Sequence, residues 1–165
     1  MLQHGKSVFW LLTIGLAAYL LATLERLPAV VASHFNAAGV PNGWSSRPTY
    51  GLLLLVIGVL LPLGVVGLLR AMTRDDLSSL NMPAREYWNR PEHREEGVRR
   101  VRGYVWWLGC LMSATAVVIH SLVLAAHTQE PPRLSTSTFL ATLGAILLGI
   151  IGWSVGWYRL LRQPR

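Results

Sequence analysis

Long stretches without a charged side chain dominate this sequence and alternate with shorter polar segments. Four stretches lack Asp, Glu, Lys and Arg altogether, and each has 18 or more residues. About 20 residues of α-helix cross the hydrocarbon core of a bilayer, and a buried soluble helix rarely runs so long without a charge. The pattern therefore predicts an all-α membrane protein with four transmembrane helices, at residues 7–24, 50–69, 103–126 and 137–158.

The composition agrees with a single integral membrane domain spanning residues 1–165. Hydrophobic residues make up 52% of the chain and charged residues only 14%, against about a quarter in soluble domains. A basic residue precedes the first apolar stretch, as in a secretory signal, but no good cleavage site follows it. We therefore expect a retained span. The lone Cys110 lies within the third predicted span and cannot form an intrachain disulfide.

Basic residues are distributed unequally among the segments that flank the apolar stretches. Twelve of the 15 Lys and Arg lie before the first stretch, between the second and third, or after the fourth. Cytoplasmic segments of membrane proteins are enriched in Lys and Arg, so we expect both termini and the loop 70–102 inside the cell (N-in/C-in). This distribution explains the net charge of +7. It favours the lipid bilayer with its anionic headgroups as a partner, and we expect no nucleic acid.

The loop between the first two predicted spans is long and rich in turn-forming residues. A 25-residue connection between adjacent helices exceeds the usual length, and such loops are commonly functional or disordered. Its part from Val30 to Phe35 is compatible with an extended strand or a short surface helix. The candidate binding residues are His34, Phe35, Asn36, Gly39, Pro41, Gly43 and Trp44. Two interpretations stay open: these side chains bind a ligand, or they form a self-packed lid in which His34 and Asn36 satisfy backbone groups.

The second predicted span has a proline in its interior, at Pro62, with Gly64 and Gly67 after it. Proline lacks the amide hydrogen that would continue the helix, and its ring displaces the preceding turn. We therefore expect a kink near the middle of this span and some freed backbone carbonyls. We interpret the kink as a packing shape and not as a hinge.

The predicted cytoplasmic loop contains a proline and aromatic motif. Its candidate residues are Asn81, Pro83, Tyr87 and Trp88. The two aromatic side chains could bind a partner, but we prefer the interpretation that they rest on lipid headgroups. Asn89 is predicted to cap the next helix, with Pro91 in its first turn. That helix is expected to continue into the third span without interruption.

Residues typical of catalytic sites are sparse. No predicted span contains a carboxylate, a lysine or an arginine, as the proton and ion pathways of transporters usually do. The sequence also lacks a phosphate-binding glycine loop, a His-Glu-x-x-His motif and a Ser or Cys nucleophile with a positioned base. We therefore predict that the protein is not an enzyme and has no cofactor.

Three histidines, His34, His120 and His127, lie on or near the predicted outer face, with Glu25 and Glu130 in the same region. Mixed histidine and carboxylate ligands can hold a metal ion. None of these residues forms a close pair on one helix, so we predict no metal site. An intramembrane residue such as His120 raises a functional hypothesis. The interpretation we prefer is a neutral imidazole bonded to a Ser, Thr or carbonyl of a neighbouring helix.

The fourth predicted span is rich in glycine. Gly152 and Gly156 lie four residues apart, a spacing that presents a groove to another helix. This groove is the candidate surface for an oligomer or for docking on a membrane protein.

Two separated motifs resemble a known family. Leu27-Pro28, His34-Phe35-Asn36, Gly39, Pro41 and Gly43-Trp44, followed by Arg47 and Pro48, are similar to the outer loop of SdpI-like proteins, small bacterial membrane proteins whose amino-terminal region is a domain of unknown function. The second motif, Asn81-Met-Pro83 with Tyr87-Trp88, looks like the family's Asn-x-Pro-x-x-x-Tyr-Trp pattern. The resemblance implies a multi-pass protein of the bacterial cytoplasmic (inner) membrane. The founding member is an immunity protein against a secreted toxin and also holds a transcriptional repressor at the membrane.

These observations favour a non-enzymatic membrane binding protein of the immunity or signalling type. Its outer loop would engage a peptide, a lipid headgroup or a periplasmic partner, and the bent second helix would relay occupancy to the cytoplasmic loop. The alternative is an accessory or structural subunit that docks on a larger membrane complex through the glycine-rich fourth helix.

Overall fold

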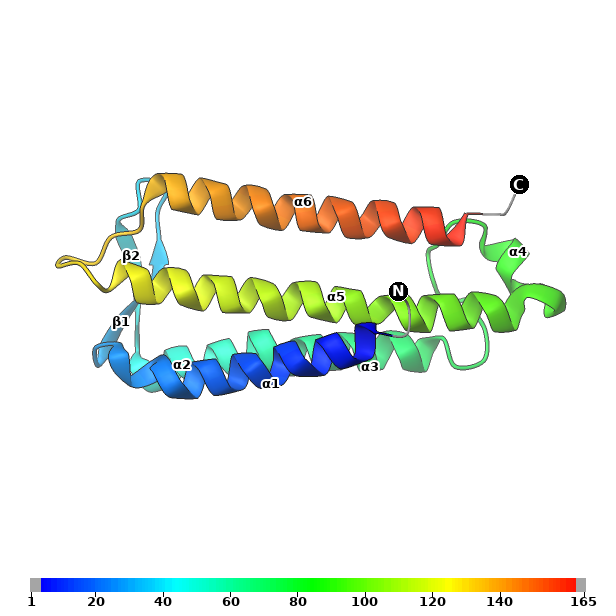
Figure 1. The fold of residues 1–165 in the computed structure, drawn as a ribbon, viewed down its shortest axis with the longest axis horizontal. Coiled ribbons are helices and arrows are strands. Elements are labelled where there is room, and N and C mark those ends of the chain that lie inside the picture. The colour runs from blue at the N-terminus through cyan, green and yellow to red at the C-terminus, as the bar shows by residue number, and fades with distance from the viewer. Residues whose placement is uncertain (1–3, 163–165) are drawn as a thin grey trace.

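The computed structural model of the chain describes residues 4–162 as a set of long helices closed at one end by a β-hairpin (Figure 1). The elements in chain order are α1 (Gly5–Thr23), the 3-10 turn η1 (Leu24–Arg26), β1 (Val30–Phe35), β2 (Pro41–Ser46), α2 (Arg47–Leu55), the π-helical turn η2 (Val56–Leu60), α3 (Leu61–Met72), α4 (Arg85–Asn89), α5 (Pro91–Ala126) and α6 (Thr136–Leu161).

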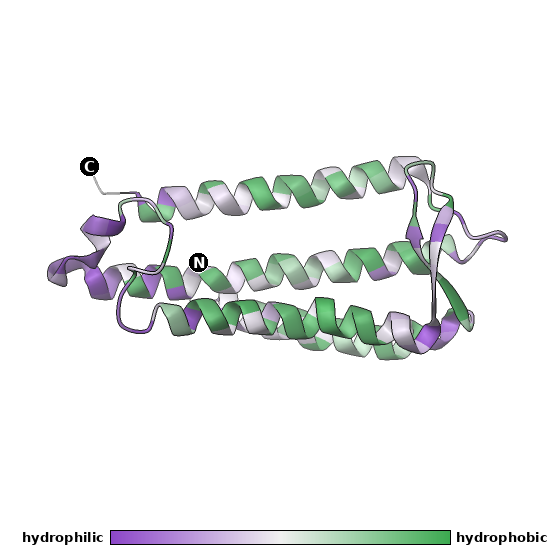
Figure 2. Cartoon of the chain, turned by 180° about the vertical axis from the view of Figure 1, so that it is seen from behind, coloured by the Kyte–Doolittle hydropathy of each residue, from purple (hydrophilic) through white to green (hydrophobic). Residues whose placement is uncertain are grey.

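Four helical stretches are long and apolar enough to cross a membrane: Gly5–Arg26, Arg47–Met72, Pro91–Ala126 and Thr136–Leu161. The predicted fold class is therefore confirmed. Figure 2 shows hydrophobic residues along the length of the helices and hydrophilic residues gathered at the two ends. The longest helix, α5, has 36 residues, or about 54 Å at 1.5 Å per residue, and so extends well past a hydrocarbon core of about 30 Å.

The two ends of the molecule differ: one carries the β-hairpin, and the other carries most of the arginines. The hairpin end comprises residues 24–49 and 127–135. The arginine end comprises residues 70–102 with the start of α1 and the end of α6, so that α1 begins and α6 finishes toward the same end (Figure 1). The connection 27–46 is extended, which decides between the two conformations that the sequence left open.

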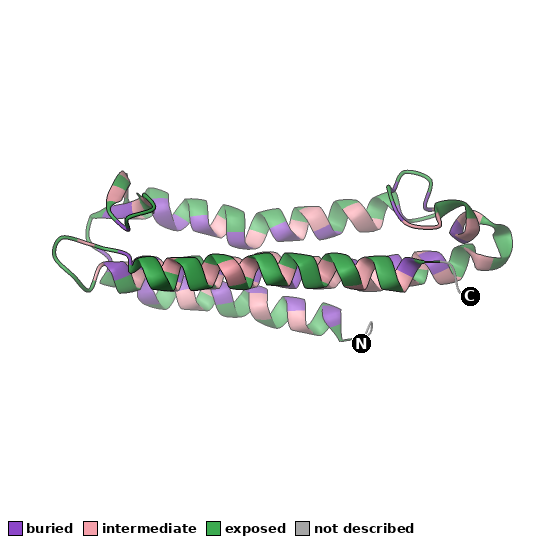
Figure 3. Cartoon of the chain, turned by 90° about the horizontal axis from the view of Figure 1, so that it is seen from above, coloured by how far each residue is buried: buried purple, intermediate pink, exposed green. Residues whose placement is uncertain are grey.

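Helix α5 occupies the middle of the bundle, between the pair formed by α1 and α2–α3 and the separate α6 (Figure 1). Its buried residues recur at helical spacing: Gly97, Val101, Val105, Gly109, Cys110, Ser113, Ala116, His120, Val123 and Ala126. In contrast, Leu161 is the one buried residue of α6, whose surface is largely exposed (Figure 3). The core of the described chain thus lies between α5, α1 and α2–α3.

Small residues let these three helices approach closely. A Cβ placed on Gly58 would lie 2.6 Å from Leu16 and 2.7 Å from Ala116, and one placed on Gly109 would lie 2.6 Å from the Phe9 ring. Real Cβ atoms do not reach such distances, so both positions require glycine for the observed packing.

A π-helical turn, η2, lies directly before Pro62, and the kink itself stays a prediction. Because Pro62 has no amide hydrogen, it cannot donate to the carbonyl of Gly58, four residues earlier. The Ser113 hydroxyl of α5 donates to this carbonyl at 3.1 Å. The freed carbonyl is therefore used in packing against a neighbouring helix, as in other deformed membrane helices.

The two glycines proposed as a helix-docking groove have different surroundings. A Cβ on Gly156 would collide with the Tyr104 hydroxyl, while one on Gly152 would meet nothing within 4 Å. Tyr104 also donates to the Trp153 carbonyl at 2.9 Å. Gly156 therefore packs against α5 of the same chain, and the pair does not form one free groove.

The segment between α3 and α5 folds around Trp88 at the arginine end. Trp88 is only 2% exposed, and its Nε1–H donates to the Leu161 carbonyl at 2.6 Å, at the last turn of α6. Arg100 donates to the neighbouring Leu160 carbonyl at 3.1 Å. The expectation that Trp88 rests on lipid headgroups is thus wrong, because the indole closes the carboxyl end of α6, whose last carbonyls have no helical partner.

Helix α5 begins one residue later than predicted. Arg90 occupies the N-cap position, with Pro91 in the first turn as expected. Asn89 does not cap because its side-chain oxygen accepts from the Leu77 amide at 2.9 Å. The uninterrupted continuation of this helix into the third span is confirmed.

Candidate functional site

The hairpin is built from an extended pair whose register is irregular. β1 and β2 are antiparallel, with Val30 opposite Ser46, Ala32 opposite Trp44 and Phe35 opposite Pro41, and the register shifts on either side of His34. Val31 and Ala32 of β1 are fully buried, and Val31 and Phe35 pack in the hydrophobic core at the helix ends. These buried residues of β1 therefore attach the hairpin to the helix ends, while other hairpin residues stay exposed.

Asn36 organises the turn of the hairpin. Its side-chain oxygen accepts from the amides of Ala38 and Val40 at 3.0 Å each. Gly39 adopts a left-handed φ of 74°, which favours glycine. This is the side-chain-to-backbone bonding that makes asparagine a turn residue. Asn36 is thus structural, as the lid interpretation holds, and its oxygen is not available to a ligand.

The tip of the hairpin is fixed to the connection between α5 and α6. The Leu134 amide donates to the Gly39 carbonyl at 3.0 Å, and a Cβ on Gly39 would collide with the Leu134 carbonyl. The hairpin thus spans the helix ends from α1 and α2 to the α5–α6 connection (Figure 1).

His127 anchors β1 to α5, a role for which the sequence offered no signal. Its Nε2 accepts from the Ala32 amide at 3.1 Å, and its Nδ1 lies 2.8 Å from the Val123 carbonyl. A ring nitrogen that accepts a hydrogen bond carries no proton, so the proton lies on Nδ1 and is donated to Val123. His127 therefore serves as a neutral bridge between strand and helix.

Arg47 joins the start of α2 to the turn after α1. One of its guanidinium nitrogens lies 3.3 Å from the Glu25 carbonyl and 3.1 Å from the Leu27 carbonyl. The Arg47 amide also donates to the Ala29 carbonyl at 2.9 Å. Arg47, one of the residues that resemble the SdpI-like motif, therefore joins the segment before β1 to the segment after β2.

The outward face of the hairpin presents apolar and aromatic side chains to the surroundings. Trp44 is 54% exposed, Val30 58% and Val40 44%. His34 is also exposed, with its Nδ1 3.2 Å from the Ser33 hydroxyl, and a Cβ on Gly43 would lie 2.9 Å from the His34 Cβ. His34 and Trp44 therefore remain available for contacts, while Phe35, Asn36, Gly39 and Gly43 shape the hairpin that carries them.

Beneath the hairpin, His120 lies fully buried between α1, α2 and α5. Its Nδ1 is 2.9 Å from the Tyr50 hydroxyl, and its Nε2 is 2.8 Å from the Thr23 hydroxyl. Because Thr23 donates its single proton to the Tyr19 carbonyl at 2.6 Å, it must accept from His120 Nε2–H. Nδ1 then accepts from Tyr50.

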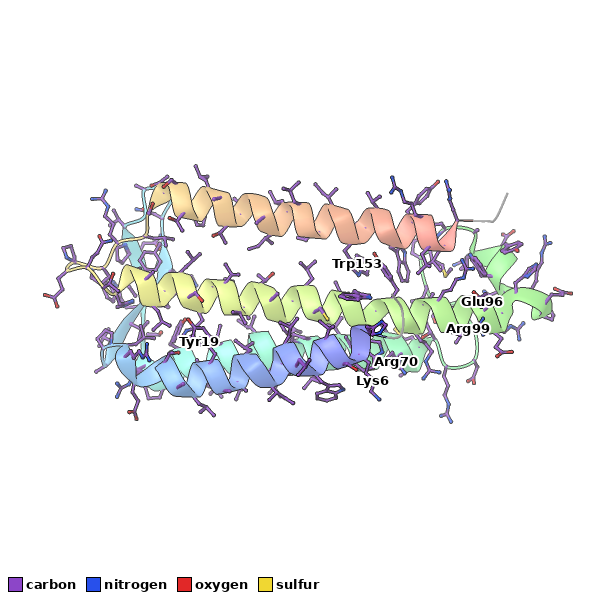
Figure 4. The ribbon with its side chains drawn as sticks, viewed as in Figure 1. Lys6, Tyr19, Arg70, Glu96, Arg99 and Trp153 are labelled. Atoms are coloured by element: carbon purple, nitrogen blue, oxygen red, sulfur yellow. The ribbon has the colours of Figure 1, made fainter. Side chains whose placement is uncertain are left out.

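The chain Tyr50, His120, Thr23, Tyr19 carbonyl is complete, since every proton in it has an acceptor. The ring of Tyr19, which is labelled in Figure 4, also meets His120 edge-on, at 5.2 Å between centroids. The Tyr19 hydroxyl lies 3.1 Å from that of Ser121. The preferred interpretation of His120 as a bonded neutral imidazole is confirmed. The network joins three helices directly below the hairpin.

Replacing Tyr50 with phenylalanine is expected to lower the free energy of unfolding by about 1 kcal/mol, because His120 Nδ1 loses its donor while buried. The measurement is chemical unfolding of the detergent-solubilised protein. Tyr158→Phe is the control, since that side chain is 60% exposed on α6. Equal destabilisation by both variants would contradict the network.

The three histidines are not brought together. His34 lies on the hairpin surface, His120 within the helices and His127 beneath β1, each with its own partners. Within residues 4–162 there is no group of three or more His, Cys, Asp or Glu side chains that could hold a metal.

Residues 11–60 match the sequence model of a family described as a domain of unknown function (DUF1648). The match covers most of α1, the whole hairpin, α2 and η2, and so contains the exposed residues His34 and Trp44. His120 and His127 lie outside it. No curated protein and no solved structure gives a significant match to the chain.

Proposed function

We propose that this chain is a non-enzymatic membrane binding protein whose hairpin engages an extended peptide or protein segment. The observation that carries the proposal is a braced hairpin with exposed Trp44, Val30 and Val40. Exposed aromatic and aliphatic side chains on a rigid element are typical contact residues. The anchors at Gly39, Arg47 and the Ala32 amide hold this face in place, which reduces the entropy lost on binding.

The hairpin also offers backbone groups. Within residues 4–162 the sheet has two strands, and the outer edge of β2 pairs with no other strand. An extended segment can add to such an edge through main-chain hydrogen bonds, while nearby side chains supply specificity. A peptide lying along β2 would place its own side chains beside Trp44.

The orientation of the chain supports binding outside the cell. In the sequence, 12 of the 15 Lys and Arg lie before the first span, between the second and third, or after the fourth, and by the positive-inside rule this supports a cytoplasmic position for the arginine end. The hairpin would then face the periplasm of a bacterial cytoplasmic membrane. The resemblance to SdpI-like proteins supports an immunity or signalling role. Strand β2 continues directly into the second span, α2–η2–α3, so this span could relay binding at the hairpin to the arginine end.

The test is affinity purification of the tagged, mildly solubilised protein from its native envelope, followed by identification of bound peptides. A His34→Ala, Trp44→Ala double variant is compared with Trp10→Ala, which removes an exposed tryptophan from the other end of α1. We expect a stoichiometric peptide or periplasmic segment whose recovery falls about 30-fold in the double variant, as for a tryptophan hot spot, and is unchanged in the control. Equal recovery by all three proteins would refute hairpin binding.

A second candidate function, an accessory subunit of a membrane complex, is favoured by α6. In the most hydrophobic part of α6 no residue is buried within the chain. In the corresponding parts of the other three spans, 28–33% of the residues are buried. Gly152→Leu is the informative variant, because Gly152 has open space around it and Gly156 does not. A membrane partner lost from Gly152→Leu and retained by the hairpin double variant would support this alternative.

A further inference from the structure

A basic cavity lies at the arginine end, between the start of α1, the end of α3 and the first half of α5. Its volume is about 440 Å³, and it is open to the surroundings. The lining residues are Lys6, Arg70, Glu95, Val98, Arg99, Arg102, Gly103 and Trp106. Four cations from three helices therefore converge on one space with a single carboxylate in its wall (Figure 4 labels Lys6, Arg70 and Arg99).

Three of the four cations of this cavity are not neutralised by an ion pair within residues 4–162. Glu96 pairs with Arg99 and Arg100, and Glu95 lies 3.9 Å from Arg99. Lys6, Arg70 and Arg102 form no ion pair with any of residues 4–162. Three like charges held together without a counterion repel one another, and a bound anion would relieve this repulsion.

Arg70 is held in position, and Arg102 has an unpaired donor. One Arg70 guanidinium nitrogen donates to the Arg102 carbonyl at 2.7 Å, and this guanidinium lies 4.8 Å from the centre of the Trp106 ring. The Nε of Arg102 is buried and has no hydrogen-bond partner among the described residues. A buried N–H group normally has an acceptor, so Arg102, which lines the cavity, keeps an unused donor there.

The depth of the cavity matches the level of lipid phosphates. The charge-free stretches 50–69 and 103–126 stop immediately beside Arg70 and Arg102. At about 20 residues per hydrocarbon core, these arginines lie at the boundary where headgroups begin. Arginine presents a planar set of donors that suits phosphate oxygens, and Trp106 is typical of the same interface.

We propose that this cavity binds an anionic phosphate group, of the kind carried by a phospholipid headgroup or by free phosphate. Arg70 and Arg102 supply directed hydrogen bonds, and Lys6 adds a flexible positive charge from α1. Because α1, α3 and α5 all contribute, a bound phosphate ties three helices together at this end. The site is independent of the hairpin and of the function proposed for it.

The test is ligand binding to the full chain in an uncharged detergent, followed by native mass spectrometry. The probes are short-chain phosphatidylglycerol, short-chain phosphatidylcholine, and inorganic phosphate at an ionic strength held constant with chloride. The Lys6→Gln, Arg102→Gln double variant removes two cations from the cavity. The Arg159→Gln, Arg162→Gln double variant removes two from the same end outside it.

We expect one phosphatidylglycerol per chain, bound more tightly than phosphatidylcholine. Since a basic residue near an anionic surface contributes roughly fivefold to binding, the cavity double variant should bind about 25-fold more weakly and Lys6→Gln alone about fivefold. Lys6 is exposed, so its replacement leaves the fold intact. The control double variant should bind as the parent does.

The phosphate arm identifies the source of the ligand. Binding of phosphate itself with the same dependence on Lys6 and Arg102 would assign the site to free phosphate, and phosphatidylglycerol binding that phosphate does not displace would assign it to lipid. Equal weakening by both double variants, equal affinity for the two lipids, or no saturable binding of any probe would overturn the proposal.

Discussion

Replacing Gly109 with leucine is expected to destabilise the helix bundle by about 3 kcal/mol or more. A Cβ at this position would lie 2.6 Å from the Phe9 ring and 2.8 Å from a Val66 methyl group, so α1 and α3 meet α5 at the same residue. Phe9 and Val66 are almost completely buried, at 0% and 2% exposure, and have no space into which to retreat. The leucine must therefore push two helices away from α5.

The measurement is thermal unfolding of the detergent-solubilised protein, followed by circular dichroism and by the fraction that elutes as a single species. Gly15→Leu is the matched control, because a Cβ on Gly15 would meet nothing within 4 Å. Both changes put leucine in place of glycine in a membrane helix, and the control should stay within about 0.5 kcal/mol of the parent. A melting temperature of Gly109→Leu equal to that of the control would show that the three helices do not meet there.

The four spans could be predicted from the sequence because a single property determines them. Absence of charge over about 20 residues marks a segment that can cross a bilayer, whichever neighbours it has. The deformation near Pro62 could be predicted for a similar reason, since the missing amide hydrogen is a property of proline itself. Which neighbour uses the freed Gly58 carbonyl could not, because Ser113 is 55 positions away and helix adjacency leaves no local signal.

The candidate site shows the same division. Asn36 and Gly39 are recognisable turn residues, and the structure uses them in a turn. The sequence does not decide the conformation of residues 30–35, because this segment mixes Val and Phe with Ser and His and lacks a clear alternation. The partners of His120 and His127 come from α1, α2 and β1, and only the folded chain brings them within hydrogen-bond distance.

At the arginine end, the sequence predicted an aromatic motif and a helix cap but misassigned two residues for one reason. Side chains that could serve a local role were used by distant backbone groups: Asn89 binds the Leu77 amide, and Trp88 binds the Leu161 carbonyl. The neighbouring sequence predicts only the nearest hydrogen-bond partner of a polar side chain. Tertiary contacts replace it where an unsatisfied backbone group lies closer.

Trp88→Ala is expected to have the second large effect, a loss of about 3–5 kcal/mol typical of a buried aromatic residue replaced by alanine. The indole is 2% exposed and packs against Gly97, where a Cβ would lie 3.1 Å from that of Trp88. Its Nε1–H donates to Leu161, and the Arg100 guanidinium lies 5.0 Å from the ring centre. Loss of the ring leaves a cavity, an unpaired carbonyl and a detached end of α6.

Because these contacts lie at one end, the effect should be partly local and visible by trypsin digestion. Cleavage at Arg85 and Arg94 should accelerate in Trp88→Ala, since these sites lie in or next to the segment that folds around the indole. Trp10→Ala, which removes a tryptophan that is 41% exposed, is the control and should be digested like the parent. Trp88→Phe keeps most of the ring volume without the N–H donor, and so should fall between the two. Digestion of Trp88→Ala at the parent rate would contradict this prediction. It would show that contacts other than those of the Trp88 indole with α6 hold the segment in its fold.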